Sequence, residues 1–185
     1  TAKDSIYTID KGILLYNDLR FETKGLIRSG NDLYSDIQVE GNNLNIKSLI
    51  RAIPAYLTVR CNEYSPEGKA DIKLSVQGNF TGTEVPAINS EFIINRGSIQ
   101  YPGLKTLPLT IGFTGSYSNG EIRNAKSSSF IFQNIHINAN ESCITGNLKL
   151  SDLHSPEIIS DLNGIIHVNE INQFIDNTVF SFNTG

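Results

Sequence analysis

The stretch Ile72-Lys73-Leu74-Ser75-Val76 decides the fold class, because apolar and polar side chains alternate along it without interruption. In an extended strand successive side chains point to opposite faces, so the three apolar residues share one face and the two polar residues share the other. Less regular alternation runs through residues 13–21, 37–39, 130–137 and 144–150. The pattern predicts an all-β protein, mainly antiparallel, built as a folded or grooved sheet or as two layers of sheet.

Two stretches break this alternation and predict short amphipathic helices. After Asn45 the apolar residues follow helical spacing, and Pro54 ends that helix or restarts it as the first residue of another turn. Residues 55–61 fit a helix or a strand equally well. The second helix covers residues 169–176, with Asn169 as its N-cap. We expect both helices to cover an end or an open mouth of the sheet rather than to bind a partner.

The dipeptide Asn119-Gly120 is the strongest hairpin signal, because both residues tolerate the positive φ of a type I′ turn. It predicts a hairpin between strands at about residues 108–116 and 121–132. At larger scale, residues 39–50 align loosely with residues 162–171, each passing from a strand into a helical stripe. We therefore expect repeat-like units at about residues 12–55 and 129–176, within a single β-rich fragment, residues 1–185, of a larger repeat-containing protein.

Composition limits the class of protein. Charged residues make up 18% of the 185 residues, hydrophobic residues 39%, and the net charge is −4. These values argue against disorder and against a nucleic-acid surface, which needs clustered basic charge. Two cysteines, Cys61 and Cys143, lie far apart and fit either two buried thiols or one disulfide. The chain contains no Met, and we interpret it as a piece of a longer protein.

Residues that could carry catalysis are few. His136, His154 and His167 match no metal-ligand spacing, and the acidic residues are scattered rather than paired. Phosphate loops, dinucleotide fingerprints and nucleophile elbows do not occur in the sequence. We therefore expect no enzyme, no cofactor and no metal site.

The middle and end of the chain carry several features in a fixed order. The Gly-x-x-Leu-x-Ile pattern of residues 41–46 leads into a short helix ending at Ile53-Pro54, and the glycine-bracketed strand of residues 68–78 follows. Residues 86–104 then run through proline, a strand, Arg96-Gly97, a short strand and Pro-x-Leu, and residues 119–125, residues 144–153 and Ser155-Pro156 come last. This succession resembles the AsmA family of bacterial envelope proteins, in which Asn-Gly is common at the place of Arg96-Gly97 and the last segments belong to a repeated sheet unit. The resemblance spans roughly residues 41–175.

The resemblance implies a periplasmic protein held at the inner membrane by an N-terminal anchor that lies outside this sequence. It also implies a role in outer-membrane biogenesis, in which phospholipid acyl chains pass along an apolar groove of the sheet. No catalytic residues accompany the family. Candidate groove residues are the same-face sets Ile72, Leu74, Val76 and Phe130, Phe132 or, if the other face points inward, Ile135 and Ile137.

Two other functions remain open at this stage. A closed β-sandwich could serve as a structural or adhesive binding module of the envelope, and its apolar residues would then be an ordinary core. A hydrolase built on a jelly roll or barrel is the weakest alternative, because no group of polar residues supports it. Tyr34, Tyr56, Tyr64, Tyr101 and Tyr117 are dispersed, which weakens a glycan-binding interpretation.

Overall fold

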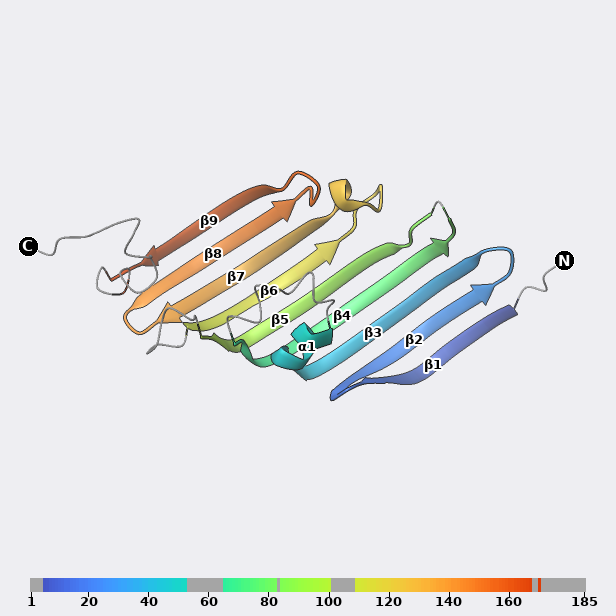
Figure 1. The fold of residues 1–185 in the computed structure, drawn as a ribbon, viewed down its shortest axis with the longest axis horizontal. Coiled ribbons are helices and arrows are strands. Elements are labelled where there is room, and N and C mark those ends of the chain that lie inside the picture. Colours follow the sequence, from blue (N-terminus) through green and yellow to red (C-terminus); the bar gives the residue numbers. More distant parts are fainter. Residues whose placement is uncertain (1–4, 53–64, 83, 101–108, 168–169, 171–185) are drawn as a thin grey trace, which may run out of the picture.

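Nine antiparallel strands form one sheet in the computed structural model of this chain, which describes residues 5–52, 65–82, 84–100, 109–167 and 170. The strands are β1 (Ser5–Tyr16), β2 (Leu19–Ser29), β3 (Leu33–Asn45), β4 (Glu67–Phe80), β5 (Ala87–Ile99), β6 (Leu109–Ser118), β7 (Ser129–Ala139), β8 (Ser142–Ser151) and β9 (Glu157–Ile165). Each strand pairs with its neighbours in sequence, in the order β1 to β9 (Figure 1). The predicted all-β antiparallel fold is confirmed. Among the described residues it forms a single layer, open at β1 and at β9.

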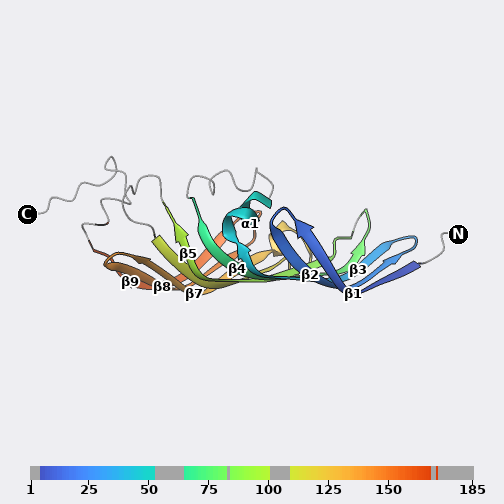
Figure 2. The same cartoon turned by 90° about the horizontal axis from the view of Figure 1, so that it is seen from below.

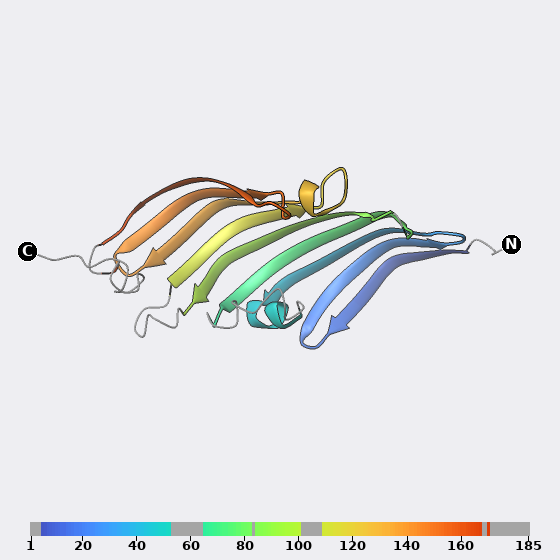
Figure 3. The ribbon, with the colours of Figure 1, turned by 45° about the horizontal axis from the view of Figure 1, so that its top comes forward.

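The strands bend in the same direction, so one face of the sheet is concave (Figure 3). An extra residue interrupts the pairing in β1, β3, β5 and β7, at residues 10–11, 42–43, 95–96 and 133–134. Such bulges bend a strand and increase its local twist. Their recurrence on alternate strands gives the sheet a shared curvature.

Two of these bulges are built in the same way. Asn43 and Asn134 adopt φ angles of 57° and 52°, a left-handed conformation that Asn tolerates better than most residues. The backbone N–H of Asn43 donates to Asp71 Oδ1 at 2.7 Å, and that of Asn134 donates to Asn147 Oδ1 at 3.2 Å. A side chain of the next strand thus accepts the hydrogen bond that the bulge takes out of the ladder.

The helix α1 (Ile46–Ala52) begins where the spacing after Asn45 predicts it. Asn45 caps it, since its side-chain Oδ1 accepts a hydrogen bond from the N–H of Ser48 at 3.2 Å. The helix lies on the concave side of the sheet, against the adjoining ends of β3 and β4 (Figure 2). Five buried apolar side chains gather at this end of the strands, namely Leu19, Leu44, Ile46, Ala70 and Ala139, whereas Pro86 is buried at the opposite end.

The predicted turn at Asn119-Gly120 is wrong in its form. Strand β6 reaches Ser118, and the connection to β7 runs through residues 119–128 with the short 3₁₀ helix η2 (Ala125–Ser127). Asn119 is 4% exposed, and its amide accepts from Ile88 N at 2.9 Å and donates to Pro86 O at 2.8 Å. Because this side chain ties β6 to the start of β5, the chain leaves the sheet instead of reversing within two residues.

Several expectations lie outside the described residues. These are the helix predicted over residues 169–176, of which only Glu170 is described, the segment of residues 55–61, and Cys61. Cys143 lies on β8 as a free thiol. Both predicted repeat units also extend outside the described residues, so the repeat stays a prediction.

Candidate functional site

The two faces of the sheet differ completely in charge. The strand register assigns every Asp, Glu, Lys and Arg within the nine strands to one face, which we call the polar face. The opposite, concave face carries Ile, Leu, Val, Phe, Tyr, Ala, Gly, Ser and Thr, and we call it the apolar face. An antiparallel sheet often has one apolar face, but a second layer usually covers it.

The covering of the apolar face is incomplete in the part of the chain that the structure describes. Helix α1 packs on one end of it, and the side chains between the strand ends are half-buried by their neighbours on the same sheet. Towards the two edge strands the exposure rises: Leu14 is 51% exposed on β1 and Ile158 is 65% exposed on β9. Large contiguous exposed apolar surfaces are typical of binding sites and interfaces.

Five aromatic rings form the floor of the apolar face over β5, β6 and β7. Phe92, Phe113 and Phe132 pack edge to face, with ring centroids 5.5 to 6.1 Å apart. Phe130 lies 6.2 Å from Phe132 and 4.8 Å from Tyr117. Edge-to-face contacts of this kind contribute about 0.5 to 1.5 kcal/mol per pair beyond the area that the rings bury. The centre of the apolar face is therefore a continuous aromatic surface.

The predicted groove residues all lie on the apolar face. Ile72, Leu74 and Val76 occupy β4, while Phe130 and Phe132 occupy β7. The register also brings Ile135 and Ile137 to the apolar face, because the bulge at residues 133–134 shifts the alternation by one residue. Strict alternation predicts that these two isoleucines lie on the face opposite Phe130 and Phe132. This prediction is wrong, because the bulge places the isoleucines and the phenylalanines on the same face.

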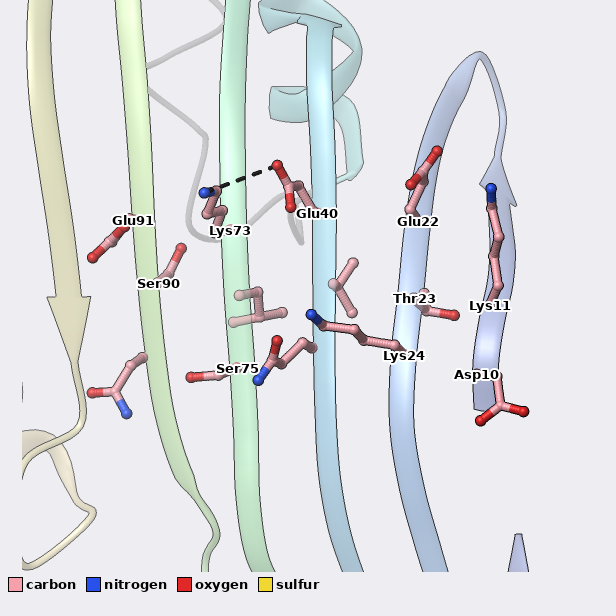
Figure 4. A pocket seen from close by; sticks show the side chains of 14 residues that line it. Asp10, Lys11, Glu22, Thr23, Lys24, Glu40, Lys73, Ser75, Ser90 and Glu91 are labelled. Carbon is pink, nitrogen blue, oxygen red and sulfur yellow. Dashed lines mark ion pairs between the residues drawn. The ribbon is translucent and has the colours of Figure 1, made fainter. Parts of the chain in front are cut away.

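The polar face carries a shallow hollow of about 460 Å³ that spans β1 to β5 (Figure 4). Its rim alternates in sign, with Lys11, Lys24 and Lys73 among Glu22, Glu40 and Glu91. Lys73 Nζ lies 4.0 Å from Glu40 Oε1, and both side chains are half exposed or more. Exposed pairs of this kind contribute little to stability. The hollow holds neither a paired set of carboxylates nor a nucleophile beside a base, so it resembles a solvated surface.

The histidines do not gather into a site. His136 lies on the polar face of β7, with Nδ1 3.2 Å from the backbone oxygen of Asn134. His167 Nδ1 lies 3.2 Å from Glu141 Oε2. Within the described ranges no three His, Cys, Asp or Glu side chains come together as metal ligands.

Sequence reasoning missed two carboxylates at the α1 end of the sheet. Asp18, in the two-residue β1–β2 turn, accepts a hydrogen bond from the Ser48 hydroxyl of α1 at 2.6 Å. This hydrogen bond lowers the pKa of Asp18, and the charges of Arg51 and Lys69 act in the same direction. The carboxylate thus joins the first hairpin to the helix across the end of the apolar face.

Glu170 plays the corresponding part at the β7–β8 turn. It is 5% exposed, and its two carboxylate oxygens accept from the backbone N–H groups of Glu141 at 3.0 Å and Ser142 at 3.1 Å. The Ser142 side chain and the Glu141 N–H lower the pKa of Glu170. In both places a carboxylate ties a hairpin turn to a segment further along the chain. Asp18 ties the β1–β2 turn to α1, which follows β3, and Glu170, which follows β9, ties itself to the β7–β8 turn. Short loops and a lone acid give no sequence signal for such a contact, because its partner lies 28 to 30 residues away.

Comparisons with known proteins give no relative. No protein-family model, curated protein or solved structure matches the chain. Among the described residues no helix has the length and apolar character to cross a bilayer.

Proposed function

We propose that the chain is a non-enzymatic segment that carries phospholipid acyl chains on its apolar face. The observation that supports this proposal is the distribution of charge: a concave face without a charged strand residue stands opposite a face that holds all of them. A closed core needs no such extent of uncovered surface, whereas acyl chains need a continuous one. The AsmA-like pattern of the sequence points the same way, to a periplasmic segment that acts in outer-membrane biogenesis.

The mechanism is passive. Each methylene group that leaves water for the apolar face contributes about 0.8 kcal/mol. An acyl chain that lies across several strands is thus held without any polar contact. It moves along the face by exchanging one set of apolar contacts for an equivalent one. Headgroups stay in solvent. The other candidate, a β-sandwich binding module, requires a second sheet over the apolar face, and the described residues form one sheet.

A photo-crosslinking experiment tests the proposal at two neighbouring positions. Leu74 points to the apolar face and Ser75 to the polar face of the same strand. A benzophenone side chain is introduced at either position, and the protein is incubated with phosphatidylethanolamine and phosphatidylglycerol vesicles and irradiated. We expect phospholipid adducts by mass spectrometry at position 74 and none at position 75.

Wild-type protein recovered from cells under gentle conditions provides the second measurement. Phospholipid should co-purify with it and should be lost in the variant Leu74→Glu but retained in Ser75→Glu. Equal crosslinking from both faces, or the absence of phospholipid from both measurements, contradicts the proposal.

A further inference from the structure

Strand β1 is an open sheet edge of twelve residues that pairs only with β2 among the described residues. Its side chains are exposed on both faces: Ile6 and Leu15 are 66% and 67% exposed on the polar face, and Tyr7 is 60% exposed on the apolar face. Natural edge strands are usually short, or carry proline, charges or a bulge, because an open ladder pairs with other chains. In β1 these protections are confined to the centre, where Asp10, Lys11 and the bulge lie together.

The bulge at Asp10 and Lys11 makes this edge symmetric. Both side chains lie on the polar face, at the hollow drawn in Figure 4, so the alternation of faces reverses between them. Residues at equal distances on the two sides of the bulge lie on the same face. Ile9 and Gly12 are both on the apolar face, and the same holds for each pair further out along β1. The two halves of β1 therefore present the same order of faces in opposite directions.

We propose that β1 pairs antiparallel with β1 of a second copy of this chain, about a two-fold axis between Asp10 and Lys11. In that register Asp10 lies opposite Lys11 of the other copy, and the same ion pair forms again on the other side of the axis. The remaining opposed positions are Ile9 and Gly12, Thr8 and Ile13, Tyr7 and Leu14, Ile6 and Leu15, and Ser5 and Tyr16.

This register is favoured by three features. Every opposed pair shares a face, whereas a shift of one residue in either direction would oppose side chains from different faces. Large apolar residues meet in the outer pairs, and opposite charges meet at the centre, both of which stabilise antiparallel strands. The two-fold axis is perpendicular to the sheet, so both apolar faces remain on the same side. The interface closes on itself and yields a dimer rather than a fibre.

The other edge does not offer the same arrangement. β9 has a regular register with β8, and its two charged residues, Glu157 and Asp161, are both acidic. Two copies of β9 would bring together acidic charges with no basic partner. This difference between the two edges is why we assign the dimer contact to β1. The proposed pairing does not depend on lipid binding by the apolar face.

A charge-swap series measured by sedimentation equilibrium tests the pairing. The wild-type chain should dimerise, and the variants Asp10→Lys and Lys11→Asp should each raise the dissociation constant by about tenfold, because two attractions become repulsions. The double variant D10K/K11D restores both ion pairs with reversed polarity and should return the constant to near its wild-type value. The reversal Asp161→Lys on β9 is the control and should leave it unchanged.

Disulfide trapping checks the register independently of charge. In a Cys61→Ser/Cys143→Ser background, cysteines at Tyr7 and Leu14 should join two copies on mild oxidation, and a pair at Tyr7 and Tyr16 should not. A chain that remains monomeric over the whole concentration range overturns the proposal. A dimer whose dissociation constant is unchanged by the single charge reversals also overturns it, and so does a dimer that crosslinks equally through both cysteine pairs. Each of these results leaves the lipid-adduct measurement at Leu74 unaffected, so the two proposals fail separately.

Discussion

Gly115 shows how closely the aromatic floor of the apolar face is packed. A side chain at this position would enter the ring of Phe92, which packs in turn against Phe113 and Phe132. Because Gly115 has no Cβ, the Phe92 ring of β5 can lie over the neighbouring strand β6. One methyl group should therefore disturb a network of rings rather than a single contact.

We expect Gly115→Ala to lower the free energy of unfolding by about 1 to 3 kcal/mol, the usual effect of overpacking. The matched control is Gly82→Ala, where an added Cβ would meet nothing within 4 Å and where we expect a change below about 0.5 kcal/mol. Urea denaturation followed by circular dichroism measures both. Equal destabilisation of the two variants would show that the ring network is not the cause.

Because the Ser48 hydrogen bond lowers the pKa of Asp18, we expect the docking of α1 to depend on pH. A carboxylate whose pKa is depressed in the folded state stabilises that state above its unfolded value, and this contribution is lost as the pH falls through the folded value. Amide hydrogen exchange in α1 should accelerate as the pH falls below about 4, after correction for intrinsic exchange. In Asp18→Asn the corrected exchange should already be fast at neutral pH and should change little on acidification. If exchange in Asp18→Asn still accelerated below about pH 4 as it does in the wild type, the role of Asp18 would be contradicted.

Local alternation was sufficient to predict which residues share a face only within an uninterrupted strand. Ile72, Leu74 and Val76 follow the rule, because β4 is regular through this stretch. Ile135 does not, because the bulge before it depends on Asn147, a residue of the next strand. Pairing between strands decides where a bulge forms, and one strand's own sequence does not carry that information.

Ile46 is the buried apolar side chain of helix α1: it is 8% exposed and lies against Gly68. A helix of seven residues is too short to be stable in isolation. We expect Ile46→Ala to cost about 2 kcal/mol, at the low end for a buried isoleucine, because the site is at the end of the sheet. The exposed neighbour Lys47 is the control, and Lys47→Ala should be nearly neutral. Thermal unfolding of both variants decides whether the helix is part of the cooperative unit.

The elements differ in how well their sequence predicts them. The start of α1 was predicted correctly, because its cap and its apolar spacing are local. The turn at Asn119-Gly120 was not, because Asn119 makes its hydrogen bonds to residues 31 and 33 positions away. A turn motif predicts a tight hairpin only where no stronger partner competes for its side chains.

At the scale of the whole molecule, alternation predicted one apolar face but left the number of layers open. Whether the sheet is a single layer or one of two depends on what covers the apolar face. The alternation of residues within a strand is the same for a single layer and for two layers. The candidate site follows from this: its residues were predicted individually, whereas their union into one surface without charge emerged only from the register of all nine strands.

We expect the stability of the sheet to fall from its centre towards β9. Every residue of β9 is exposed, and the strand has one partner in the described part of the chain. Hydrogen exchange measured by mass spectrometry should show the slowest exchange in β4 to β6 and the fastest in β9. Equally slow exchange in β9 and β5 would mean that another segment protects that edge.

The consecutive order of the strands also determines how the chain folds. Each strand pairs with the strands just before and just after it, so no pairing skips a strand. The loops that must close range from residues 17–18 between β1 and β2 to residues 46–66 between β3 and β4. Folding can start at any hairpin and extend in both directions, as in repeat proteins. A sheet of this size would otherwise be slow to fold, since β proteins dominated by distant pairings fold in milliseconds to seconds. Here a broad surface forms from strands that pair in the order in which they follow one another in the sequence.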